Sequence, residues 1–291
     1  FGARPFAYEI SIATHLMQKN FDVEFADYAG TGRFDFLARL GQAEIEVECK
    51  STSSDTGRKI HRQEVNRLTD LILPTTQQLA GARGCHLIRI TIPNRLGKAN
   101  EHLVHIASLV SAASGNKRST ASDLASVEYT FEDLRTWPEP GRDLEAREFF
   151  ESRFGLTNAY MLFSGRSGFS IVAVAIASDK ADSVVDALSE AAKEAADQCT
   201  GSRPALIALH LIDQIDRAEL ATMLKTANGM HAIAGSVFNS SKRSHVDSIA
   251  FTIPQVQQFI SDRSMRLSAP VLILNNPSPQ FRCDTVRQIF R

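Results

Sequence analysis

The chain has 291 residues, of which 43% are hydrophobic, 8% aromatic and 22% charged, a balance typical of a globular protein. This composition excludes disordered, collagen-like and coiled-coil proteins. With 32 Lys and Arg against 33 Asp and Glu, the net charge is -1, so no overall field indicates a nucleic-acid or membrane partner. The length exceeds a usual single core of about 100 to 200 residues, so we expect two domains or one domain with a large elaboration.

Cysteine usage favours a reducing compartment and therefore a cytoplasmic location. The four cysteines are far apart and form no CxxC pair. The longest apolar run, Ile171 to Ala177, is much shorter than the roughly 20 residues of a membrane-spanning helix. Residues 1–5 lack the pattern of a secretory signal, and the absence of an initial Met is compatible with a longer native chain.

The first elements follow from periodicity. Apolar residues at helical spacing predict a helix over 6–17 that ends near Asn20. Alternation predicts a strand over 21–25, followed by a loop of turn formers at 28–32. Residues 33–50 then predict two antiparallel strands joined by a two-residue turn.

The turn of this hairpin sets its register. Gly41-Gln42 suits a type II′ turn because Gly stands at the first loop position. With Leu40 opposite Ala43, the residues separate cleanly onto two faces, which a slip of one residue would mix. The apolar face holds Phe34, Phe36, Ala38, Leu40, Ala43, Ile45, Val47 and Cys49. The polar face holds Asp35, Leu37, Arg39, Glu44, Glu46, Glu48 and Lys50, with Leu37 as the exception.

A second helix over 58–80, disturbed at Pro74, and a strand over 86–92 follow the hairpin. The order helix, three strands, helix, strand indicates an α/β sandwich core. We therefore predict a core domain, 1-95, and an α/β extension, 96-291, that docks on it. The extension is expected to hold helices over 101–113, 180–198 and 217–227, strands over 127–131, 159–163, 169–177, 204–211, 248–253 and 270–274, and a break at 137–141.

Two carboxylates and an amine are predicted to converge on the hairpin. Opposed Asp35 and Glu48 would have Cβ atoms about 4.5 to 5.5 Å apart, so one cation could bridge them. Lys50 follows on the same face and can offset their repulsion. Glu9 lies on the face that the first helix should bury, where a carboxylate needs a partner such as Lys50 or a metal.

Glu9, Asp35 and the run Glu48-Cys49-Lys50 resemble the PD-(D/E)xK, or restriction-endonuclease-like, nuclease superfamily. The resemblance covers roughly residues 5 to 93, and the family's Pro before the Asp is replaced by Phe34. It implies a restriction-endonuclease-like α/β core, made of a helix, a three-stranded antiparallel meander, a helix and a strand, with an α/β C-terminal elaboration.

The resemblance also implies roles for these residues. Asp35 and Glu48 would ligate Mg²⁺ or Mn²⁺ through oxygen atoms, with the backbone carbonyl of Cys49 as a further ligand. Lys50 would orient or help deprotonate the attacking water and offset charge in the transition state, while Glu9 would hold a metal-bound water or steer Lys50. Water would attack the phosphodiester.

Local charge is compatible with a nucleic-acid partner. Between Lys50 and Asn100 there are nine basic residues and three acidic ones. We predict nucleic-acid contacts at the start of the second helix, with a solvated surface as an equal alternative. The candidate contact residues are Arg58, Lys59, Arg62 and Gln63. Glu46 shares the face of Glu48 but lies nearer the turn, so a solvated role is favoured over a metal role.

The sequence therefore predicts a divalent-metal-dependent nuclease that hydrolyses phosphodiester bonds, with a DNA endonuclease favoured over an enzyme acting on RNA. The alternative is a catalytically silent module that serves as a nucleic-acid or protein binding platform. A homodimer or a larger complex is compatible with either reading, and no membrane partner is expected.

Overall fold

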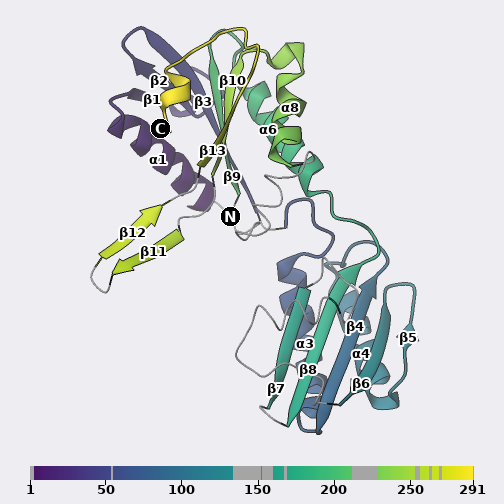
Figure 1. Cartoon of the computed structure of the whole chain (residues 1–291). Coiled ribbons are helices and arrows are strands. Elements are labelled where there is room, and N and C mark those ends of the chain that lie inside the picture. Colours follow the sequence, from purple (N-terminus) through teal and green to yellow (C-terminus); the bar gives the residue numbers. More distant parts are fainter. Residues whose placement is uncertain are drawn as a thin grey trace. The chain divides into compact units, whose positions relative to one another are not determined.

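The computed structural model describes residues 3–53, 55–133, 152, 160–166, 169–211, 229–252, 256–261, 264–268 and 271–290. It is a mixed α/β structure with two mixed sheets, which belong to two compact units (Figure 1). Unit 1 comprises residues 1–57 and 183–291, and unit 2 comprises residues 58–182. This division differs from the predicted domains 1-95 and 96-291, because unit 2 is inserted into unit 1 rather than following it.

A six-stranded sheet forms the centre of unit 1, in the order β1-β2-β3-β9-β10-β13. Its first three strands form an antiparallel meander, β3, β9 and β10 are mutually parallel, and β13 is antiparallel to β10. The strand bounds are β1 Asp22–Phe25, β2 Phe36–Leu40, β3 Ala43–Thr52, β9 Ala205–Leu211, β10 Val246–Thr252 and β13 Val271–Asn275.

The predicted hairpin is confirmed, and so is its register over the paired residues, whereas the predicted pair of Asp35 with Glu48 lies just beyond the ladder. Leu40 pairs with Ala43 and Phe36 with Val47, so every residue between them has the expected partner. A type II′ turn needs a positive φ at its first central residue and a negative φ at its second. Gly41 has a φ of 61°, and the φ of Gln42 is not positive.

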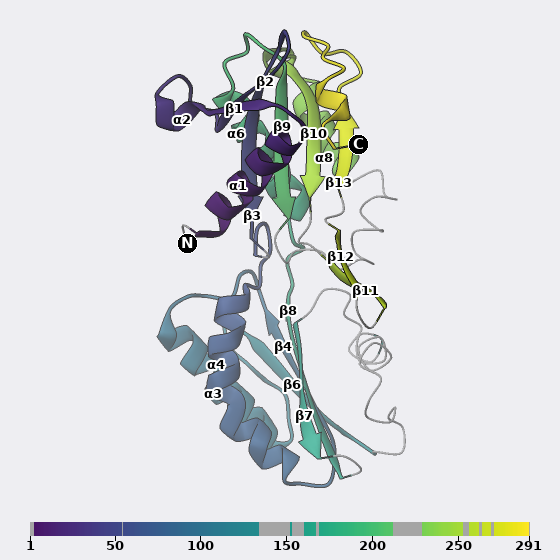
Figure 2. The ribbon, with the colours of Figure 1, turned by 90° about the vertical axis from the view of Figure 1, so that its left-hand side faces the viewer.

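Helices cover both faces of this sheet (Figure 2). Helix α1 (Ala3–Gln18) packs on one face, over a core that includes Phe36, Val47 and Cys49. Helices α6 (Val184–Gln198) and α8 (Met230–Phe238) pack on the other face. That second core explains Leu37, which is buried there although it shares the predicted polar face. Phe34 also lies in the second core and not with the α1 side, because it precedes the paired part of β2.

The helix and strand that follow the hairpin do not complete its sheet. Helix α3 begins at Arg62 rather than at 58 and continues through Pro74 to Ala80. Strand β4 (Gly84–Ile92) pairs with β6 and β8 in unit 2. The strand beside β3 is β9, and α6 precedes it. The sheet of the hairpin therefore takes its next strand, and the helix before that strand, from a later part of the chain.

Unit 2 has a five-stranded sheet in the order β5-β6-β4-β8-β7. Helices α3 and α4 (Asn100–Asn116) lie side by side over one face and share an aliphatic core with it (Figure 2). The remaining strand bounds are β5 Thr120–Ala121, β6 Ser126–Glu132, β7 Tyr160–Arg166 and β8 Ser170–Ser178.

The smaller elements are helix α2 (Ala26–Ala29), the hairpin β11 (Val256–Ser261) with β12 (Ser264–Ser268), and two 3-10 turns, Ser241–Arg243 and Val286–Gln288. The predicted helix over 217–227 and the break at 137–141 lie outside the described residues. Within the described ranges, no helix is both long enough and apolar enough to cross a membrane.

Candidate functional site

The carboxylates of the hairpin lie where β2 and β3 stop pairing. Asp35 directly precedes β2, and its Oδ2 accepts a hydrogen bond of 2.6 Å from the backbone N–H of Cys49 in β3. The carboxylate of Asp35 thus accepts the hydrogen bond that a backbone carbonyl would accept in a continued β-ladder. This bond holds Asp35 against β3, the strand that carries Glu48 and Lys50.

Glu48 is the most perturbed acid at this position. It is 2% exposed, and its Oε1 lies 3.5 Å from the Nζ of Lys50. Its Oε2 is buried and has no hydrogen-bond partner among the described residues. Burial, and then the nearby charge of Asp35, raises the pKa of Glu48 to about 8, while Lys50 acts in the opposite direction.

Two further acids share this environment. Burial raises the pKa of Asp35, and the hydrogen bond from the Cys49 N–H opposes that rise. Glu9, half-buried on α1, also has a raised pKa, first because of burial and then because of the charge of Asp35, with Lys50 opposing. The structure therefore brings Glu9, Asp35, Glu48 and Lys50 into one electrostatic cluster.

Both the backbone and the thiol of Cys49 interact with Asp35 of this cluster. The thiol is buried in the core beneath α1, and this burial raises its pKa well above the ordinary value. In an extended strand, the N–H and C=O of one residue point to the same edge. Because the Cys49 N–H meets Asp35, its carbonyl lies on the side of the acids.

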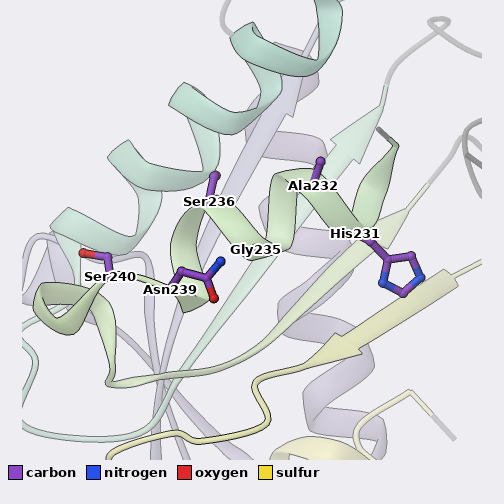
Figure 3. Close-up of a pocket in the computed structure, with 6 residues that line it drawn as sticks. All are labelled: His231, Ala232, Gly235, Ser236, Asn239 and Ser240. Carbon is purple, nitrogen blue, oxygen red and sulfur yellow. The ribbon is translucent and has the colours of Figure 1, made fainter. Parts of the chain in front are cut away.

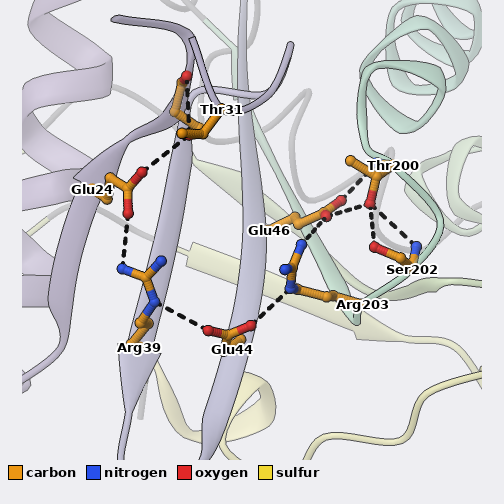
Figure 4. A network of polar contacts seen from close by, with 9 residues as sticks. Glu24, Thr31, Arg39, Glu44, Glu46, Thr200, Ser202 and Arg203 are labelled. Atoms are coloured by element: carbon orange, nitrogen blue, oxygen red, sulfur yellow. Dashed lines mark hydrogen bonds and ion pairs between the residues drawn. The ribbon is translucent and has the colours of Figure 1, made fainter. Parts of the chain in front are cut away.

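Glu46 has neither the solvated role that was predicted nor a place in the acid cluster. It is fully buried, and its carboxylate accepts hydrogen bonds from the N–H and Oγ1 of Thr200, with Arg203 3.4 Å away (Figure 4). Arg203 also binds Glu44, and Arg39 continues the network to the first strand. This network joins β1, β2 and β3 to the loop before β9.

We expect Thr200→Val to lower the free energy of unfolding by about 1 to 3 kcal/mol, because it removes a donor to a buried carboxylate while the backbone N–H stays. Urea denaturation would measure this loss. Ser202→Ala, which removes an exposed hydroxyl of the same network, serves as the control and should change stability by less than about 0.5 kcal/mol. Equal losses in the two variants would contradict the assignment.

The predicted nucleic-acid contacts all belong to unit 2. Arg58 precedes α3, and its Nη1 lies 3.5 Å from Asp182, while the backbone N–H of Lys59 donates to the same carboxylate. Arg62 and Gln63 are exposed in the first turn of α3. Their grouping with the acid cluster of unit 1 stays a prediction.

His210 was not among the site residues predicted from the sequence. This half-buried residue lies near the end of β9, and its backbone pairs with Ser51 on one side and Thr252 on the other. Its ring stacks on Tyr8 of α1, whereas Lys50 pairs with Leu209 of the core under α6 and α8, so the two side chains extend from opposite faces of the sheet. The available signal was an imidazole at the carboxyl end of a buried parallel strand, where α/β proteins place functional groups.

A pocket of about 470 Å³ lies along α8 and the residues after it (Figure 3). Its lining residues are small or uncharged except for one imidazole: His231, Ala232, Gly235, Ser236, Asn239 and Ser240. None of the clustered acids lines it, so the pocket and the acid cluster are separate features.

Within the described part of the chain, no three or more His, Cys, Asp and Glu side chains form a metal-ligand group. A cation at the acid cluster would therefore bind Asp35 and Glu48 together with backbone or water oxygens, a set that Mg²⁺ accepts. No family model, curated protein or solved structure matches the chain.

Proposed function

We propose that the chain is a divalent-metal-dependent nuclease that hydrolyses phosphodiester bonds, with DNA as the favoured substrate. The observation that carries the proposal is the buried Oε2 of Glu48, which has no hydrogen-bond partner among the residues that the structure describes and lies beside a second carboxylate and an amine. Leaving such an oxygen unpaired is unfavourable, and a bound cation would satisfy it.

The topology of unit 1 supports the same proposal. Helix α1, an antiparallel meander, helix α6 and strand β9 parallel to β3 follow one another in the order that the nuclease resemblance implies. We infer that unit 1 is a restriction-endonuclease-like core into which unit 2 is inserted, between the third strand and the second helix of that core.

The donor set fits Mg²⁺ or Mn²⁺. Asp35 and Glu48 would hold the cation, with the carbonyl of Cys49 as a third oxygen donor. When bound, the cation supplies Lewis-acid chemistry, lowers the pKa of coordinated water and offsets negative charge on the phosphate.

The chain's own residues supply positioning and charge. Lys50, held near Glu48, offers a positive charge and hydrogen-bond donors to the attacking water and to the phosphate. Glu9 can accept a hydrogen bond from that water, and the charge of Lys50 acts on its carboxylate. The half-buried setting limits bulk water, which strengthens these electrostatic effects.

Incubation of the chain with supercoiled plasmid, linear and single-stranded DNA, and total RNA, in Mg²⁺, Mn²⁺ or EDTA, tests the proposal. We expect cleavage with metal, none in EDTA, and a loss of about a hundredfold to a thousandfold in Lys50→Ala. Cleavage that persists in EDTA, or no cleavage of any substrate by the folded chain, would overturn the proposal. Binding that chelator leaves unchanged would then favour a binding platform.

A further inference from the structure

The residue before Asp35 is anchored in the core beneath α6 and α8. Phe34 is 2% exposed and belongs to the same buried cluster as Ala26 and side chains of both helices. Its ring also lies against Gly32, since a Cβ added to that glycine would be under 3.0 Å from three atoms of the ring. In a close-packed interior, the ring of Phe34 and the backbone at Gly32 therefore fix each other's position.

The loop that leads to Asp35 is closed by backbone hydrogen bonds. The carbonyl of Ala26 accepts hydrogen bonds from the N–H of Thr31 at 2.9 Å and from that of Gly32 at 3.3 Å. The N–H of Ala26 donates to the backbone carbonyl of Asp35 at 2.9 Å. Ala26 is fully buried in the core that also holds Phe34. The loop thus returns to its own start, and the same residue holds the backbone of Asp35.

These contacts determine where the Asp35 carboxylate lies. Phe34 immediately precedes Asp35, and Phe36 after it begins the paired part of β2, so the chain is held on both sides. The carboxylate itself meets the N–H of Cys49 at 2.6 Å. A displacement of the Phe34 backbone would be passed directly to Asp35 and would weaken this contact.

We propose that Phe34 and Gly32 are positioning residues for Asp35. The ring of Phe34, in contact with Gly32 and with the core beneath α6 and α8, sets the point from which the Asp35 carboxylate reaches the cation. The inference rests on the proposed nuclease function, and both residues act through Asp35. The φ of Gly32 lies outside the left-handed region, so glycine is needed there for space and not for its conformation.

Gly32→Ala tests this role, because its methyl group would displace the Phe34 ring. Calorimetric titration of the folded variant with Mn²⁺ should give an affinity about tenfold to a hundredfold below that of wild type. Adding Phe34→Leu, which removes the crowded Cε1 and Cζ, should restore the affinity to within about fivefold of wild type. Gly115→Ala on α4 is the control, since its methyl group meets open space and should leave the affinity unchanged.

Amide hydrogen exchange in the metal-free chain separates positioning from general support of the sheet. The Cys49 N–H, which donates to Asp35, should exchange about tenfold faster in Gly32→Ala, while the Val47 N–H on the same strand keeps its wild-type rate. Equal acceleration at both amides would make Gly32 a support of the whole sheet and would overturn the inference.

The remaining outcomes distinguish this inference from the proposed function. Wild-type Mn²⁺ affinity in Gly32→Ala would overturn the inference and leave the nuclease proposal intact. Phe34→Leu alone, which needs no crowded methyl group, should lower the affinity by about threefold, and an unchanged affinity would count equally against the inference. A wild-type chain that neither binds Mn²⁺ nor cuts DNA would refute the proposed function, and this inference with it.

Discussion

Glu48→Gln should lower metal-dependent cleavage by at least about a thousandfold. The amide keeps the shape of the side chain but removes the negative charge that would hold the cation beside Asp35. The atom most directly affected is the buried Oε2, for which the described part of the chain supplies no hydrogen-bond partner. Single-turnover cleavage with saturating Mg²⁺ would measure the loss, and a titration with Mn²⁺ would show whether metal affinity falls with it.

Glu46→Gln is the matched control for this substitution. Glu46 lies two residues earlier on the same face of β3 and is also buried, but Thr200 and Arg203 satisfy its carboxylate. We expect its cleavage rate to stay within about threefold of wild type at a temperature where the variant is folded. If the two variants lose activity equally, the acid cluster is not the catalytic centre.

Glu48 should also make the metal-free chain less stable as the pH rises. Its pKa is about 8 in the folded chain, above an ordinary value of 4.5, so the folded state holds a proton that the unfolded state has released between those values. The stabilising effect of this proton is complete below pH 4.5 and is lost as the pH rises through 8. At about 1.4 kcal/mol for each pH unit, the total loss is roughly 5 kcal/mol.

Thermal unfolding of wild type and Glu48→Gln in EDTA, from pH 5 to pH 9, would measure this effect. The Gln variant should match wild type near pH 5 and exceed its Tm near pH 9, because the amide does not ionise. Mg²⁺ at pH 9 should raise the Tm of wild type and leave that of the variant nearly unchanged. Parallel pH profiles for the two proteins would refute the assignment.

Local patterns were sufficient to predict the hairpin. Alternation of polar and apolar residues over 33–50 permits one register, since a slip would bury charges and expose the core. Gly41 supplied the positive φ that the turn needs. The closeness of Asp35 and Glu48 followed from that register, without any knowledge of the rest of the fold.

The partner of β3 could not be predicted in the same way. Strands β4 and β9 are both apolar, and each follows a helix. No local feature of either strand identifies which of the two pairs with β3. One signal was available, because the run Ala205 to Leu209 is wholly apolar, as a parallel strand covered on both faces should be, whereas β4 carries His86 and Arg89.

The contrast between Glu46 and Glu48 has a similar origin. Both occupy the same face of β3, and nothing in the hairpin sequence separates a structural carboxylate from a candidate ligand. The difference comes from Thr200 and Arg203, which reach Glu46 from a loop more than 150 residues later. His210 was missed for the same reason, because its neighbours Tyr8 and Thr252 come from opposite ends of the chain.

The insertion of unit 2 has a consequence for the order of folding during synthesis. Strand β9 can pair with β3 only after the ribosome has made residues 58–182. During that part of synthesis, one edge of β3 stays unpaired in the nascent chain. Asp182 binds the backbone of Lys59, and the N–H of Ser183 donates to the carbonyl of Gly57 at 2.8 Å. When unit 2 is folded, its first and last residues therefore lie close together. The entropic cost of closing the loop between β3 and β9 is then that of a short loop rather than a long one. Early folding of the inserted unit would therefore speed assembly of the sheet that carries the acid cluster.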